Sequence, residues 1–467
     1  MPLRGALHPK SLFPPFCRVT EISSDKIPSF AEALSTVYSP LRPLPRTDVI
    51  RFDSRLICVA LCLLIVGSVS DAKTLTVLLL ANASTQGQIQ EKLKEYSKEH
   101  NGTDFNVSIV QYSALTAKIN TLVTAGEPPD ILEVTTAYIQ TYAGQALDLG
   151  QYTNREDLLN QYLPSYQAFI KSGSKVIGVP IEATINGLFY NKDLFAQAGI
   201  TAPADPANIW TWAQFKDVLE KVMKLPTCRI GVAYDCSVQR WSNLLYQANG
   251  RWISEDGKVI LPDRNAAAEA LNYFRGLVEA KLVPTSSWPG KTDGGPLFKT
   301  GVTALMWAGN WELKTLVEGG TLFPFGTTFF PKDKIRAACP GGEFFIGFAK
   351  SQYHDDAAKV LLWWAEPETT KRYLENLGGS LLSPIHDLPI NYGKYTEYLK
   401  PMLDDLNATP QWVAEDLARP ELNLLQNDLL DQLILYSTGR SGLDATLSQI
   451  DKLGSQVLGR NSVLSQK

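Results

Sequence analysis

Aromatic side chains beside polar ones are the clearest chemistry-bearing feature of this 467-residue sequence. It contains 10 Trp, 18 Tyr and 18 Phe residues, and Trp241 and Trp311 stand among polar neighbours in "QRWSN" and "GNWE". Aromatic planes cover the C–H faces of sugar rings, while carboxylate, amide and guanidinium groups pair with the hydroxyls. The pattern indicates recognition of a polyhydroxylated ring. Core packing is the alternative, and it is favoured for Trp363 and Trp364, which lie inside an apolar helix.

Four carboxylates offer a second kind of chemistry. Hydrolysis of a glycoside needs only two carboxyl groups, and no spacing rule excludes such a pair from a sequence. The candidates are Asp130, Glu133, Glu182 and Glu343. We favour contacts with a ligand or with solvent over catalysis for these side chains. A secreted glycosidase or lyase is the alternative function.

The sequence lacks the common motifs for metals and cofactors. After residue 72 its histidines are His100, His354 and His386, and none belongs to an HExxH motif. It also has no CxxC pair, GxSxG turn, Walker A loop or GxGxxG turn. We therefore expect neither a metal nor a cofactor. Binding of another solute, such as a polyamine, a phosphodiester or iron, is a further alternative, although no matching side-chain cluster is visible.

Length and charge narrow the class of protein. A chain of 467 residues exceeds what one compact core usually holds, which predicts two domains. Its 44 Lys and Arg residues against 48 Asp and Glu residues give a net charge of −4. This balance, without a basic cluster, argues against nucleic acid or an anionic membrane surface as the partner.

The N-terminal region has the pattern of an export signal preceded by extra residues. Arg51 and Arg55 precede an apolar run over 56–66, and small residues follow up to Ala72. The run is shorter than the roughly 20 apolar residues of a membrane-spanning helix. The predicted division is a non-native extension over 1–48, a cleavable signal peptide over 49–72 and a mature chain that starts at Lys73.

The cysteines agree with export. Three of the six precede Lys73. Cys228 and Cys236 flank the segment "RIGVAYD", and we expect them to close a small disulfide loop in an oxidising compartment. Cys339 is then left as a free, buried thiol.

The mature chain begins with alternating strands and helices. Apolar runs predict strands over 73–81, 105–112 and 130–134, and helical periodicity separates them. This β-α-β-α-β order builds a parallel sheet with right-handed crossovers. Ligands of such sheets bind beyond the carboxyl ends of the strands, here at 81–85 and 134–138.

The middle of the chain predicts a crossing between domains. Residues 175–195 contain two short β-like runs around a polar centre that includes Gly187. Helical segments follow, and Thr211 with Gln214 matches a capping box at the start of one of them. The chain returns to a strand over 341–350, and the remainder is mostly helical.

One stretch carries a family resemblance. "GVPIEATINGLFYNKDLFAQAGI" (178–200), followed by Thr211, Trp212 and Phe215, resembles the hallmark of extracellular solute-binding proteins of ABC importers. The similarity is to the carbohydrate-binding branch, which includes maltose-binding protein. Further marks stand in the same order along the chain: "GEPPDI" (126–131), "FKTGVTALMWAGNW" (298–311), "GGEFFIGFAK" (341–350) and "STGRSGLDATLSQI" (437–450).

The resemblance implies a fold and its division. The expected class is α/β, a two-lobed clamp in which each lobe has a mainly parallel sheet flanked by helices and the ligand lies between the lobes. By analogy, lobe one comprises 73–183 plus 348–400, and lobe two comprises 187–343 plus 405–467. The chain is then expected to cross between lobes near 183–187, 344–348 and 400–405.

The resemblance also implies a function. It suggests a monomeric periplasmic receptor that captures a sugar, either a mono- or an oligosaccharide, or a polyol. The lobes would close around the ligand by a hinge motion and present the closed form to the ABC permease in the membrane. Such a receptor performs no catalysis and has no nucleic-acid partner.

Candidate ligand contacts follow from the resemblance position by position. Thr184 stands where maltose-type proteins have a ligand glutamate, and Gln426 stands where they have an aromatic residue. Both departures argue against maltose as the ligand. The expected ligand-binding residues are Asn82, Ser84, Thr135, Tyr138, Glu182, Thr184, Asn186, Arg240, Trp241, Asn310, Trp311, Gly341, Gly342, Glu343 and Gln426.

Overall fold

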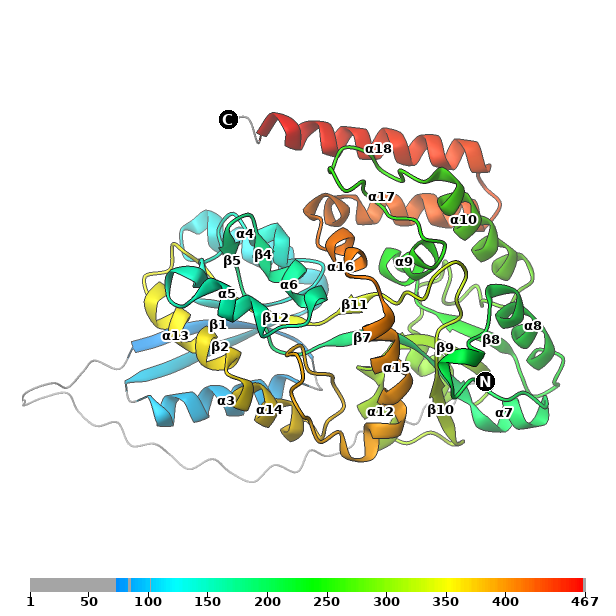
Figure 1. The fold of residues 1–467 in the computed structure, drawn as a ribbon, viewed down its shortest axis with the longest axis horizontal. Helices are drawn as coiled ribbons and strands as arrows, with labels where there is room; N and C mark the ends of the chain where they lie inside the picture. The colour runs from blue at the N-terminus through cyan, green and yellow to red at the C-terminus, as the bar shows by residue number, and fades with distance from the viewer. Residues whose placement is uncertain (1–72, 83–84, 101, 465–467) are drawn as a thin grey trace, which may run out of the picture. The chain divides into compact units, whose positions relative to one another are not determined.

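The computed structural model describes residues 73–82, 85–100 and 102–464 (Figure 1). The expected extension and signal peptide lie outside the described residues, as does Ser84. The described residues belong to one compact unit. Within the described part of the chain, no helix combines the length and the apolar composition needed to span a bilayer.

The predicted β-α-β-α-β unit is confirmed, and it belongs to a five-stranded sheet. The second strand in space, β1, runs parallel to both of its neighbours, as expected. β12 comes from much later in the chain and runs antiparallel to β3 and β6. The strand order is β2 (Thr103–Val110), β1 (Lys73–Leu80), β3 (Ile131–Thr135), β12 (Glu343–Gly347) and β6 (Val179–Pro180).

Helices from two separate stretches of the chain pack around this first sheet. Figure 1 shows α3, α13 and α14 close together beside it, and α13 contacts both β12 and β6. Trp363 and Trp364 on α13 are buried, which confirms their predicted core role. The helices are α3 (Gln86–Glu99), α4 (Leu115–Ala125), α5 (Arg155–Asn160), α6 (Pro164–Ile170), α13 (His354–Ala365) and α14 (Pro367–Asn376), with the short strands β4 (Lys171–Ser172) and β5 (Lys175–Val176).

The segment that follows the first crossing begins a second sheet. β7 is central in it and runs antiparallel to β10 and β9, while β8 and β9 are parallel. β11 (Pro340–Gly341) also pairs with β7, outside this path. The strand order is β10 (Phe325–Thr328), β7 (Thr184–Asn191), β9 (Thr303–Gly309) and β8 (Ile230–Tyr234).

Helices around the second sheet begin with local signals visible in the sequence. The capping box of α8 is present, because Thr211 Oγ1 accepts from Gln214 N and Gln214 Oε1 accepts from Thr211 N. Asn191 caps α7, because its Oδ1 accepts from Asp193 N and Leu194 N. The helices are α7 (Lys192–Gln197), α8 (Trp212–Val222), α9 (Val238–Gln247), α10 (Arg264–Glu279), α11 (Gly294–Lys299) and α12 (Glu312–Glu318).

Two extended connections join the sheets, and the hydroxyl of one tyrosine contacts the backbone at both of them. Residues 181–183 lead from β6 into β7, and Gly342 is the single residue between β11 and β12. The Tyr166 hydroxyl lies within hydrogen-bond distance of the Gly341 and Thr184 carbonyl oxygens, at 2.6 and 3.3 Å. A Cβ at Gly342 would collide with the Glu182 carbonyl, so only glycine allows the two connections to lie this close.

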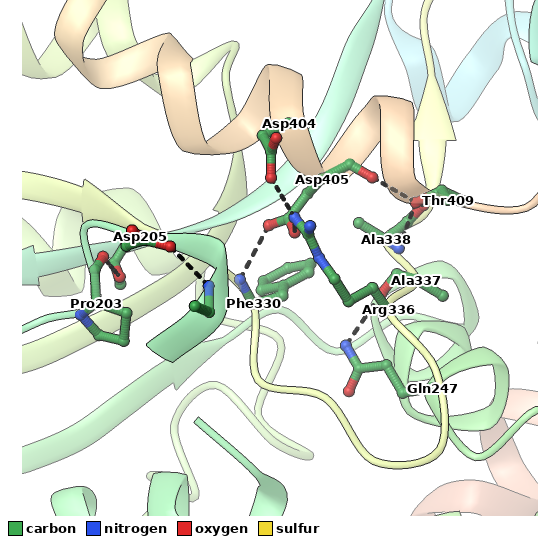
Figure 2. A network of polar contacts seen from close by, with 12 residues as sticks. Pro203, Asp205, Gln247, Phe330, Arg336, Ala337, Ala338, Asp404, Asp405 and Thr409 are labelled. Atoms are coloured by element: carbon green, nitrogen blue, oxygen red, sulfur yellow. Dashed lines mark hydrogen bonds and ion pairs between the residues drawn. The ribbon is translucent and has the colours of Figure 1, made fainter. Parts of the chain in front are cut away.

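The C-terminal helices tie the second sheet to its surroundings. α15 contacts β7 and β10, and α16 packs against α6. Figure 2 shows Arg336 pointing toward two aspartates of α15, with Nη2 at 2.6 Å from Asp404 Oδ2 and 2.8 Å from Asp405 Oδ1. The helices are α15 (Thr396–Ala408), α16 (Gln411–Leu417), α17 (Pro420–Ser437) and α18 (Leu443–Leu464).

The expected disulfide is not formed. Cys228 and Cys236 are free thiols that stand before and after strand β8. An extended chain rises about 3.3 Å per residue, which separates these positions far beyond the roughly 7 Å that a disulfide allows between Cα atoms. Cys339 is free and buried, as predicted.

Candidate functional site

A cavity of about 830 Å³ lies where the carboxyl ends of the parallel strands of both sheets meet the connections between the sheets. This volume is within the range of small-molecule sites. The residues that line it are Leu80, Ala81, Asn82, Tyr112, Thr135, Thr136, Ala137, Glu182, Thr184, Asp235, Cys236, Ser237, Val238, Gln239, Arg240, Ser242, Lys291, Thr292, Asp293, Trp311, Glu312, Thr315, Gly341, Gly342, Glu343, Leu417, Leu422 and Gln426.

Ten of the expected ligand-contact residues come together in this cavity. They come from both sheets, from both connections and from helices α9 and α17, so segments far apart in sequence line one cavity. The ten are Asn82, Thr135, Glu182, Thr184, Arg240, Trp311, Gly341, Gly342, Glu343 and Gln426.

Trp241 is a correction to the sequence-based expectation. Its side chain is 1% exposed and does not line the cavity. It packs on Trp252, with 5.5 Å between ring centroids. On α9 the Arg240 side chain faces the cavity, whereas the Trp241 side chain faces the hydrophobic core.

Three more expected contact residues do not line the cavity: Asn186, Asn310 and Tyr138. Asn310 Oδ1 accepts a hydrogen bond from Ile185 N at 2.8 Å, and its amide reaches the Ala183 carbonyl at 3.4 Å. Asn186 Oδ1 accepts from an amide of α9. These two amides hold the first connection in place. Tyr138 packs edge-on against a cavity-lining tyrosine at 5.4 Å.

That tyrosine, Tyr112, is a residue the sequence analysis missed. It lies just after β2, it is 49% exposed, and it lines the cavity. Asp235 was missed in the same way, directly after β8. The sequence could have identified Tyr112 and Asp235, because each follows the carboxyl end of a parallel strand, where ligands bind. Glu312 and Lys291 also line the cavity, and they had no comparable signal.

The wall formed by the first sheet and the connections is rich in buried carboxyl groups. Asn82 Nδ2 donates to Glu343 Oε1 at 2.9 Å, and Tyr373 OH lies 3.4 Å from Glu182 Oε2. Behind them Glu133 is fully buried, and Leu80 N donates to its Oε2 at 2.7 Å. Several acceptors therefore face the space from which ligand hydroxyls would donate.

Burial shifts the proton equilibria of this group. The pKa of Glu133 is raised well above its ordinary value, first by desolvation and then by Glu343. The pKa of Glu182 is raised well above its ordinary value for the same two reasons. Carboxyl groups held neutral in this way can donate as well as accept hydrogen bonds.

The opposite wall, formed by the second sheet, carries Arg240 and Trp311. The Arg240 guanidinium lies 4.5 Å from the Trp311 ring centroid. Its Nε is 3.5 Å from Asp235 Oδ2, and its Nη1 donates to Gln239 Oε1 at 2.8 Å. The N-cap of α9 fixes the backbone here, since Ser237 Oγ accepts from Arg240 N at 3.2 Å.

The arrangement suits recognition of a polar ring. Indole and phenol rings, carboxyl groups, a guanidinium and hydroxyls surround a space open to a small molecule. Among the described residues there is no group of three or more His, Cys, Asp or Glu side chains placed to hold a metal ion.

Solved structures share this fold. The GacH receptor of Streptomyces glaucescens GLA.O, crystallised unliganded and with acarbose, matches with a TM-score of 0.68 at 19% identity, over 83% of this chain and 98% of that one. The sugar-binding protein MalE of Xanthomonas citri matches with a TM-score of 0.65 at 17% identity, over 85% and 100%. The fold is therefore the predicted α/β two-lobed fold of solute-binding proteins.

The family follows from sequence. The model of the bacterial extracellular solute-binding protein family matches residues 82–371, and the chain belongs to that family. A relative, the lactose-binding protein of Rhizobium radiobacter, is 26% identical over 321 residues, which is 63% of this chain and 74% of that protein. The family is one of exported binding proteins rather than enzymes.

Proposed function

We propose that this protein is the sugar receptor of an ABC importer. It captures a mono- or oligosaccharide, or a polyol, and delivers it unchanged to the membrane permease. The observation that carries the proposal is the cavity of about 830 Å³, which is lined from both sheets by aromatic, carboxyl, hydroxyl and guanidinium groups. The family and the sugar-binding relative support it.

The strand pairing suggests revised lobe boundaries. β12 pairs with β3 in the first sheet, whereas we expected a crossing at 344–348. α15 contacts β7 and β10, so the return to the second lobe comes before residue 400. We assign 73–183 and 343–390 to lobe one, and 184–342 and 396–464 to lobe two.

Hinge closure is the proposed mechanism. The two connections at 181–183 and Gly342 are short, and each lies between strands of different sheets. A ligand that contacts both walls stabilises the closed form, because only the closed form allows both sets of contacts. The closed surface is what the permease recognises. We further propose that the receptor is a monomer, exported through a signal peptide that is cleaved before Lys73.

A thermal-shift screen tests the proposed function. Purified protein is mixed with lactose, maltose, an arabino-oligosaccharide, D-mannitol or D-tagatose. A binder stabilises the folded protein by RT ln(1 + [L]/Kd), so the melting temperature rises with ligand concentration. A flat response to every carbohydrate would refute sugar binding, and turnover of any glycoside would refute the absence of catalysis.

Trp311 provides the mutational test of the site. Loss of a stacking aromatic in Trp311→Ala should weaken sugar binding by about 1–3 kcal/mol, measured by calorimetry. Trp412→Ala is the matched control, because Trp412 is also half-buried and also carries an arginine on its ring but does not line the cavity. Equal affinity in the wild type and Trp311→Ala would show that the site is misassigned.

A further inference from the structure

The indole of Trp311 is covered on two sides. On one side lies the backbone of Gly309, where a Cβ would collide with the six-membered ring of the indole. Over the ring lies the guanidinium of Arg240, at 4.5 Å from its centroid. Trp311 is the only tryptophan that lines the cavity in the described part of the chain, so the cover falls on the one indole available there for stacking.

Arg240 is held in this position by side chains of its own wall. The Arg240 side chain is about nine-tenths buried, and the contacts of its guanidinium come from β7, from the end of β8 and from α9. Their distances run from 2.8 to 3.5 Å, which is looser than a bidentate ion pair. The partners are Asp235 at 3.5 Å, Gln239 at 2.8 Å and Asn186 at 3.5 Å.

Acidic side chains near Arg240 provide a place for it to move. Asp235 already lies within reach of Nε and also lines the cavity. Glu312 lines the cavity beside Trp311, and burial, followed by the charge of Asp235, raises its pKa, while Arg240 lowers it. A guanidinium that leaves the indole can therefore stay paired with a carboxylate.

We propose that Arg240 is a displaceable cover on the sugar-stacking face of Trp311. In this structure the guanidinium occupies the face, and an incoming ring must displace it toward Asp235 and Glu312. The inference rests on the proposed function, because it concerns the same cavity. Arg240 then sets specificity, since a ligand binds well only if its contacts outweigh those of the guanidinium on the indole.

The cover itself is tested without any ligand. The full chain is labelled with 5-fluorotryptophan, and Trp311→Leu assigns the Trp311 fluorine resonance. Arg240→Ala should increase the solvent isotope shift of this resonance between H2O and D2O, because the indole becomes accessible. Arg251→Ala is the matched control: Arg251 lies 4.8 Å from the Trp412 ring centroid, outside the cavity, so it should change only the Trp412 resonance. An unchanged Trp311 shift in Arg240→Ala overturns the proposal.

Competition is tested with the sugar that raises the melting temperature most in the screen described above. Arg240→Ala should bind that sugar about thirtyfold more tightly, the size of one desolvated cation–π contact. In the Trp311→Leu background the same substitution should bring no gain. Weaker binding by Arg240→Ala in both backgrounds would make Arg240 a direct ligand donor and overturn the proposal. If no sugar binds, the proposed function fails. The fluorine measurement then decides by itself whether Arg240 shields the Trp311 indole.

Discussion

Asp405 allows a pH-dependent stability to be worked out from the structure. Its carboxylate accepts from Arg336 Nη2 at 2.8 Å and from Phe330 N at 3.0 Å (Figure 2). Burial raises the pKa of Asp405 to about 6 from its ordinary 3.8, although Arg336 opposes the shift. At neutral pH the folded protein therefore holds an ionised carboxylate that burial disfavours.

The sign and size of the effect follow from linkage. A group whose pKa is raised in the folded state stabilises the protein fully below its unfolded pKa, and this stabilisation is lost as pH rises through the folded value. For Asp405 the window runs from about pH 4 to about pH 7. A shift of about two pKa units corresponds to a loss of about 3 kcal/mol of unfolding free energy across that window.

Asp405→Asn removes this titration. Its amide cannot accept from both Arg336 and Phe330, so the variant carries a constant penalty at every pH. The wild type loses about 3 kcal/mol of unfolding free energy between pH 4 and pH 8 through Asp405, and the variant does not. The unfolding free energy of the variant minus that of the wild type should therefore rise by about 3 kcal/mol over this range. Urea denaturation at steps of one pH unit measures the difference.

Asp404→Asn is the matched control for this experiment. Asp404 also accepts from Arg336, at 2.6 Å, but its side chain is only half-buried. The control removes the same charge and should keep most of the pH dependence of the wild type, because burial is the main cause of the Asp405 shift and the charge of Asp404 the smallest. If the Asp405→Asn and wild-type curves are parallel from pH 4 to pH 8, the reasoning from burial is refuted.

Three further predictions concern other groups. Asp416→Ala should lower the unfolding free energy by about 3–5 kcal/mol in urea denaturation, because two buried backbone N–H groups lose their acceptor; a loss below about 1 kcal/mol would contradict this. Glu133→Gln should have little effect on the melting temperature at pH 4 and should raise it at pH 9, because the folded protein keeps Glu133 neutral while the unfolded chain ionises it above its ordinary pKa of 4.5; equal effects at both pH values would argue against it. Mass spectrometry of unreduced protein should find Cys228 and Cys236 as free thiols, and a peptide linked through them would contradict the structure.

Local patterns predicted the fold well. Apolar runs identified β1, β2 and β3, and the Thr211–Gln214 capping box identified the start of α8, because these signals depend only on neighbouring residues. The pairing of β12 with β3 is different. A strand's partner depends on packing across the whole chain, so the sequence pattern identified the strand but not its partner, and the expected crossing at 344–348 overlapped the strand.

The site was partly predictable for the same reason. The rule that ligands bind at the carboxyl ends of parallel strands leads to Asn82 and Thr135, and applied more widely it leads to Tyr112 and Asp235. The sequence could not show whether Trp241 faces the cavity or the core, because α9 is buried along most of its length and has no clear exposed face. The contact between Arg240 and Trp311 joins distant segments, and no local pattern encodes it.

The position of β12 has a consequence for biosynthesis. Strand β3 stays without one of its partners until the ribosome has translated residues 343–347, by which time every strand of the second sheet has already been made. A nascent chain or a fragment that stops earlier exposes the bare edge of a nearly fully buried strand, which invites pairing with other chains. The order of the strands therefore favours a polypeptide that is kept unfolded until translation has passed Gly347.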